Sequence, residues 1–189
     1  MILHVHHVQT TDTNAYCIGP DGPGDAILID PGSIDTTLLR HIEDNHYRLA
    51  AILVTRPNDF HVSGIRTIKR IYDAEIIAPC RSLFNFPCRF VEDGDRFQIG
   101  ECAIRVLGMP KHARDSVVYE IGGMLFTGDL LTAGMVDVSA TPYGRALLAE
   151  TIRSELFPYP EQTPIFSTFG PPTTVGIEAA VNPDCAPTP

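Results

Sequence analysis

The chain has 189 residues, and 14 basic against 23 acidic side chains give a formal net charge of −9. This length suits a single domain with a hydrophobic core. We expect residues 1–189 to form it, with 184–189 as a flexible tail. The negative charge argues against nucleic-acid binding and against an anionic membrane surface, because both attract clustered Lys and Arg. No apolar run approaches the roughly 20 residues that span a bilayer. The expected partner is therefore a small molecule or another protein, with no nucleic acid and no membrane.

Five cysteines, an odd number without a CxxC pair, favour free thiols in a reducing compartment. The first residues, MILHVHHVQT, lack the basic and apolar regions of a secretory signal. Together these features predict a cytoplasmic protein.

The first half of the chain alternates short strands with helices. Apolar runs and alternation predict strands at 2–8, 14–18, 26–29, 51–54 and 74–78. The turn at 20–24 joins the second and third of these as a hairpin. Apolar residues at helical spacing predict helices at 35–45 and 62–72.

The second half is mostly β. Strands are predicted at 97–99, 102–107, 117–121, 124–127 and 164–167, with Gly122-Gly123 joining the third and fourth of them. Helices are predicted at 145–157 and 173–180. Two comparable halves of this kind favour an α/β class in which two sheets pack together with helices outside, a four-layer αββα sandwich.

Eight short motifs lie along this pattern in a familiar order. They are Thr13-Asn14-Ala15-Tyr16-Cys17-Ile18, Ile27-Leu28-Ile29-Asp30-Pro31-Gly32, Val54-Thr55, Val62-Ser63-Gly64-Ile65, Glu92-Asp93-Gly94-Asp95, His112 with Ser116-Val117-Val118-Tyr119, Phe126-Thr127-Gly128-Asp129 and Gly170-Pro171-Pro172-Thr173-Thr174. Together they resemble the metallo-β-lactamase-fold superfamily, specifically its compact glyoxalase-II-like hydrolases. The resemblance covers about residues 2–183 and implies an αββα sandwich with its site along one edge of the sheets.

The resemblance also implies a site of two metal ions held by seven side chains. In such sites a metal-bound hydroxide attacks an ester, thioester or amide carbonyl. Three of the seven positions keep a ligand in this sequence, namely His61, His112 and Asp129. The other four positions carry Arg56, Asn58, Phe60 and Phe169, where the resemblance leads us to expect His, His, Asp and His.

The replacements change the chemistry of the site. Arginine has no available lone pair and phenylalanine has no donor atom, while Asn58 offers only a carbonyl oxygen, which is a weak ligand for zinc. We therefore expect no cofactor. A sheltered Asp129 without metal ions would be an uncompensated charge, and Arg56 can pair with it through its planar fork. Phe60 and Phe169 are then expected to fill the emptied second metal site.

Other interpretations stay open. A slip of one residue would let Asp59 supply the missing carboxylate. His61, His112 and Asp129 could hold a single zinc or iron ion with water as the fourth ligand, and Asp129 would then take part in catalysis.

Two further roles concern residues around the ligand positions. The resemblance implies that Asp30 supports the ligand loop from behind, and Asp59 lies beside the same loop. Metal-independent catalysis through Arg56, Lys111 or Asp129 is a third interpretation, in which Arg114 adds positive charge.

The leading hypothesis is a pseudoenzyme, that is, a non-hydrolytic binding, regulatory or structural domain, with a homodimer as one option. The alternative is an atypical single-metal hydrolase of a thioester or another small carbonyl substrate. No feature of the sequence names the ligand.

Overall fold

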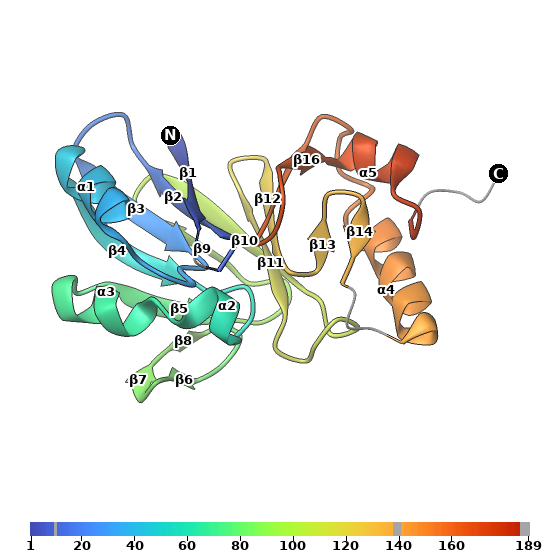
Figure 1. Ribbon diagram of the computed structural model, residues 1–189, viewed down its shortest axis with the longest axis horizontal. Coiled ribbons are helices and arrows are strands. Elements are labelled where there is room, and N and C mark those ends of the chain that lie inside the picture. The colour runs from blue at the N-terminus through green and yellow to red at the C-terminus, as the bar shows by residue number, and fades with distance from the viewer. Residues whose placement is uncertain (10, 138–140, 186–189) are drawn as a thin grey trace.

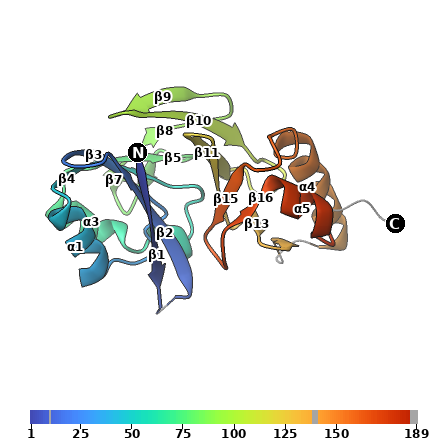
Figure 2. The ribbon, with the colours of Figure 1, turned by 90° about the horizontal axis from the view of Figure 1, so that it is seen from above.

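The computed structural model describes residues 1–9, 11–137 and 141–185. Two six-stranded sheets form its centre, and helices lie outside both of them (Figures 1 and 2). None of the helices in these ranges has the length and apolar character needed to cross a membrane.

The first sheet comes from the N-terminal half. Its strands run in the order β1 (Ile2–Val8), β2 (Thr13–Gly19), β3 (Gly24–Ile29), β4 (Tyr47–Leu53), β5 (Glu75–Ala78) and β8 (Arg89–Phe90). The pairs β1–β2 and β2–β3 are antiparallel, and β3, β4, β5 and β8 are parallel. Parallel neighbours need crossovers, which contain the helices α1 (Thr36–Asp44), α2 (Asp59–Val62) and α3 (Ile65–Ile71) and the hairpin of β6 (Ser82–Leu83) and β7 (Phe86–Pro87).

The second sheet comes from the C-terminal half. Its order is β16 (Thr173–Thr174), β15 (Pro164–Ser167), β12 (Met124–Gly128), β11 (Val117–Ile121), β10 (Cys102–Gly108) and β9 (Arg96–Ile99). The helices α4 (Pro142–Glu155) and α5 (Val175–Val181) lie on its far side (Figure 2). A small hairpin of β13 (Leu131–Thr132) and β14 (Met135–Val136) follows β12.

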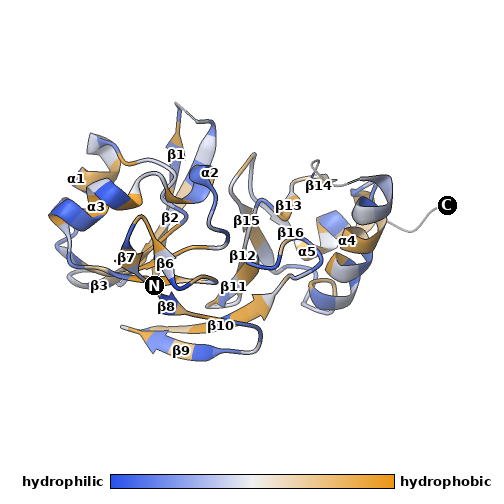
Figure 3. Ribbon diagram, turned by 90° about the horizontal axis from the view of Figure 1, so that it is seen from below, coloured by the Kyte–Doolittle hydropathy of each residue, from blue (hydrophilic) through white to orange (hydrophobic). Residues whose placement is uncertain are grey.

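Three clusters of buried side chains fill the spaces between the four layers. Successive side chains of a strand point to opposite faces, so Leu28 packs toward the helices of the first half whereas Ile29 packs between the sheets. In the same way Phe126 points between the sheets and Leu125 points toward α4 and α5. Figure 3 shows β10 largely in the hydrophobic colour and hydrophilic outer turns on α3. The predicted four-layer αββα sandwich is confirmed.

Several element boundaries differ from those predicted. The helix expected at 62–72 is α3, which begins later, at Ile65, and a separate short helix, α2, precedes it, with Ser63 and Gly64 between the two. The first two residues of the helix expected at 173–180 form the strand β16 instead, and the helix α5 follows. Two other elements start earlier than expected: β4 starts at Tyr47, and α4 starts at Pro142, where Thr141 caps its first turn. The two-residue strands were not predicted, because a strand this short has no periodicity to detect.

The expected tail is described only in part. Cys185 is buried in the cluster beneath α4, and the Asp184 carboxylate accepts a hydrogen bond from the backbone N–H of Val136 at 3.4 Å. The expectation of flexibility for 186–189 lies outside the described residues.

Candidate functional site

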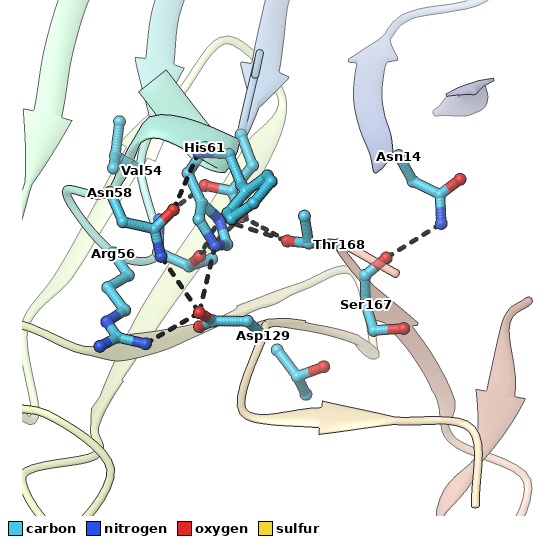
Figure 4. Close-up of polar contacts among 12 residues, drawn as sticks. Asn14, Val54, Arg56, Asn58, His61, Asp129, Ser167 and Thr168 are labelled. Carbon is cyan, nitrogen blue, oxygen red and sulfur yellow. Dashed lines mark hydrogen bonds and ion pairs between the residues drawn. The ribbon is translucent and has the colours of Figure 1, made fainter. Parts of the chain in front are cut away.

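Loops from both sheets meet at one edge of the sandwich and bring the candidate residues together (Figure 4). Arg56 and Asn58 follow β4, Asp129 directly follows β12, Phe169 follows β15, and His112 lies in the loop between β10 and β11. The structure therefore gathers residues that are up to 113 positions apart in the chain, from Arg56 to Phe169.

The loop that carries Arg56 is held from behind by Asp30. The two carboxylate oxygens of Asp30 accept hydrogen bonds from the backbone N–H and the hydroxyl of Thr55, at 2.8 and 2.6 Å. The side-chain oxygen of Asn58 caps α2 by accepting from the N–H of Phe60 at 3.0 Å. Asp30 thus lies where a supporting carboxylate was expected.

Glycines allow the loops to approach closely at two points. A Cβ at Gly32 would lie 1.9 Å from the carbonyl oxygen of Phe60, so only glycine lets α2 pack on this loop. Gly128 has φ +61°, and a Cβ there would lie 2.3 Å from the Thr55 hydroxyl. These contacts set the positions of Phe60 and Asp129 relative to each other.

Arg56 and Asp129 form an ion pair, as predicted. Arg56 Nη1 donates to Asp129 Oδ2 at 2.8 Å, and Asn58 Nδ2 donates to the same oxygen at 3.1 Å. The Arg56 side chain is 28% exposed and that of Asp129 15% exposed, so the pair is largely sheltered. Burial alone would raise the pKa of Asp129, but the neighbouring His61 and Arg56 charges hold that pKa well below its ordinary value.

His61 is fully buried between two carboxylates. Its Nδ1 lies 2.9 Å from Asp30 Oδ2 and 3.2 Å from the Thr168 hydroxyl, and its Nε2 lies 3.7 Å from Asp129 Oδ2. Burial lowers the pKa of His61, but the negative charges of Asp30 and Asp129 outweigh burial and raise that pKa to about 9. The ring is therefore an imidazolium at neutral pH, and Asp129 faces two cations.

The imidazolium predicts a pH dependence of stability. A folded-state pKa near 9, raised above the unfolded value of 6.5, stabilises the fold fully below pH 6.5. We expect this contribution, on the order of 2 kcal/mol, to be lost as the pH rises through 9. Thermal melts of the wild-type protein and a His61→Gln variant between pH 6 and 10 measure it. The variant is needed because the thiols of the unfolded chain also titrate in this range and affect both proteins alike. Parallel decreases in Tm for the two proteins would contradict the assignment.

His112 is neutral. Burial and the nearby Arg56 charge lower the pKa of His112, against the opposing effect of Asp129 and Asp137. Its Nε2 lies 3.1 Å from Asp137 Oδ2, and its Nδ1 lies 2.8 Å from the Ser116 hydroxyl. Because an ionised carboxylate can only accept, Nε2 carries the proton and Nδ1 accepts from the hydroxyl. No motif or periodicity pointed to Asp137, which follows the two-residue strand β14.

Phe60 and Phe169 line a cleft rather than fill it. Their rings contact each other with centroids 5.5 Å apart and planes at 72°, and Phe60 is 50% exposed. A cleft of about 650 Å³ lies beside them, and Thr132, Met135 and Val136 also line it. The expectation that both rings occupy the emptied metal site is wrong, because α2 carries Phe60 at the rim of this cleft.

The remaining candidates lie at or beyond the rim. Asp59 lines the cleft on the exposed first turn of α2 but has no hydrogen bond to the Asp129 cluster among the described residues. Lys111 and Arg114 are exposed and do not belong to the lining. The geometry therefore does not bring Lys111 or Arg114 into the site.

The residues do not fit a pair of metal ions. A guanidinium donates to the carboxylate that would bridge the ions, and the two phenylalanines supply no ligand atoms. His61 Nδ1 and His112 Nε2 lie against the carboxylates of Asp30 and Asp137 as proton donors, whereas a metal ligand needs a free lone pair. Within the described ranges, no group of three or more His, Cys, Asp or Glu side chains has the geometry to hold a metal ion.

No family model matches the chain. The hydroxyacylglutathione hydrolase of Methylobacillus flagellatus is 36% identical over 110 residues, which are 57% of this chain and 44% of the relative. The chain spans about half the length of the first such hydrolases that it matches.

Two solved structures have a similar backbone. ETHE1 from Myxococcus xanthus aligns with a TM-score of 0.84 at 23% identity, over 97% of this chain and 84% of that one. A protein crystallised in a di-iron-bound form aligns with a TM-score of 0.79 at 25% identity, over 95% of this chain and 98% of that one.

Proposed function

We propose that the chain, which belongs to the metallo-β-lactamase superfamily and resembles its glyoxalase II branch in sequence, is a non-hydrolytic binding, regulatory or structural domain. The observation that carries the proposal is the contact of 2.8 Å between Arg56 Nη1 and Asp129 Oδ2. A permanent cation occupies the space beside the carboxylate where a metal ion would have to sit, and it supplies part of the charge that the ions would supply.

A second cation supports the same proposal. The imidazolium of His61 lies 3.7 Å from the same Asp129 oxygen that accepts from Arg56, so two protein groups compensate the charge of the carboxylate. A metal ion would have to displace Arg56 and a proton from His61 before it could bind. Both displacements cost free energy and weaken metal affinity.

The zinc and iron content of the purified protein distinguishes a non-hydrolytic domain from a metal-dependent hydrolase. We expect substoichiometric metal in protein purified without chelator, and no gain after incubation with excess zinc or iron, because Arg56 excludes the ion. Elemental analysis measures the metal, and release of free thiol from a hydroxyacylglutathione measures hydrolysis. Stoichiometric metal together with turnover would overturn the proposal.

One observation favours an atypical single-metal hydrolase as the second candidate. His61 Nε2 is buried without a hydrogen bond from the described part of the chain, and it lies with His112 Nε2 around Asp129, each 3.7 Å from one of the carboxylate oxygens. A single ion could bind there only after His61 and His112 each lose the proton on Nε2. The elemental analysis decides between the candidates, since this one requires one ion of zinc or iron per chain.

Location and partners follow as part of the proposal. All five cysteines are free thiols, which is typical of a reducing compartment such as the cytoplasm. The proposed partner is a small molecule, a protein or a second copy of the chain. Size-exclusion chromatography with light scattering tests the last of these.

A further inference from the structure

The cleft beside Asp129 has a lining that is both aromatic and negatively charged. Phe60 and Phe169 meet nearly at a right angle and form an aromatic corner at its rim. The exposed thioether of Met135 lies in the same wall. A cleft of about 650 Å³ is of the size that takes a small organic molecule.

The charges of the cleft favour a cation over an anion. Arg56 contributes one positive charge, which is already paired with Asp129, while Asp59 and Asp129 contribute two negative charges, so these three residues leave a net negative charge. Behind the loop, His61 and Asp30 oppose each other and cancel. The whole chain, at −9, adds to the same field.

Two carboxylates in the lining of the cleft keep acceptor capacity. Asp129 Oδ2 accepts hydrogen bonds from Arg56 and Asn58, whereas Oδ1 accepts none from the described residues and lies 3.7 Å from His112 Nε2. The Asp59 carboxylate has no ion pair or hydrogen bond within the described ranges, and it is exposed at the rim. A ligand with N–H donors satisfies these oxygens, and a carboxylate ligand does not.

We propose that the cleft binds a small primary amine in its ammonium form that carries an aromatic or alkyl group. The ammonium meets the carboxylates of Asp129 and Asp59 and the faces of the aromatic corner, which attract cations. The apolar group packs against Met135 and Val136. This inference rests on the proposed function, because a metal-filled site would reverse the charge of the cleft.

Three probes with one phenyl group and different charges test the inference at pH 7. They are 2-phenylethylammonium, 2-phenylethanol and 3-phenylpropionate, titrated by NMR or calorimetry into the full chain. We expect the ammonium to bind about tenfold more tightly than the alcohol, and the carboxylate to bind more weakly than both. Equal affinity for the three probes, or preference for the carboxylate, would overturn the inference.

Matched variants locate the binding. Phe60→Ala removes a half-exposed ring of the aromatic corner and should weaken ammonium binding about fivefold. Phe90→Ala removes a 40% exposed ring outside the cleft, one that stacks with Arg81, and should change nothing. Asp59→Asn should weaken the ammonium and not the alcohol. An unaffected Phe60→Ala variant would contradict the assignment.

The metal content of the same samples separates the two proposals. Stoichiometric metal with thioester turnover would refute the proposed function, whatever the amine does. If the protein is metal-free and inactive and does not bind 2-phenylethylammonium, only the inference about the ligand is refuted.

Discussion

Arg56→Ala should destabilise the protein by about 2 kcal/mol, which corresponds to a decrease in Tm of about 4–8 °C. Removing the guanidinium leaves a sheltered carboxylate without its closest cation. Asp129 keeps the more distant imidazolium of His61, and Arg56 is partly exposed, so the loss is smaller than for a fully buried pair. Urea titration and thermal melts measure the change.

An exposed ion pair provides the matched control. Arg48 pairs with Asp25 through two hydrogen bonds at 2.6 and 2.5 Å, but its side chain is 75% exposed. Arg48→Ala should therefore cost about 0.5 kcal/mol or less. Equal losses of stability from the two substitutions would show that burial from solvent does not strengthen the Arg56–Asp129 pair.

A double substitution tests the mechanism of the loss. Arg56→Met combined with Asp129→Asn removes both charges, so no sheltered charge is left uncompensated. We expect this variant to be more stable than Arg56→Ala, with a coupling energy of about 1 kcal/mol or more. Unchanged melting of Arg56→Ala, with no metal taken up, would refute the role of Arg56 as the substitute for metal charge.

Restoring the four replaced ligands should produce the largest change in chemistry. A variant with Arg56→His, Asn58→His, Phe60→Asp and Phe169→His should bind two divalent ions per chain, because His61, His112 and Asp129 already lie around the same space. It should also gain thioester hydrolysis, which paired ions support by activating water. Elemental analysis and thiol release measure the two effects.

The control is the same variant with Asp129→Ala added. This change removes the carboxylate that the two metal ions would share and should abolish both metal uptake and turnover. A folded quadruple variant that takes up no metal would refute the idea that the loss of these four ligands is what separates this site from a dinuclear one.

The sequence alone predicted much of the fold. The continuous apolar run at 26–29, where Leu28 and Ile29 point into different clusters, indicates that both faces of the sheet are covered. The predictions failed where local pattern is weak. The break between α2 and α3 arises because Gly64 donates its N–H to the Pro31 carbonyl at 2.9 Å, a contact between segments far apart in the chain.

The candidate site was predictable in its residues and not in its shape. The family resemblance placed Arg56 and Asp129 in one site, and a sheltered carboxylate must be compensated, so their pairing could be predicted from the sequence. The placement of Phe60 at the rim did not follow, because it depends on how α2 packs against Gly32.

Residue chemistry by itself determined which ligands the chain lacks, because donor atoms are a property of each side chain and need no fold. The tertiary structure alone decided which groups besides Arg56 surround Asp129. It places His61 between Asp30 and Asp129, couples His112 to Asp137 and leaves an open aromatic corner beside the pair. The reason is physical: the strength of a charge interaction depends on distance and shelter, and both arise only when segments distant in sequence pack together.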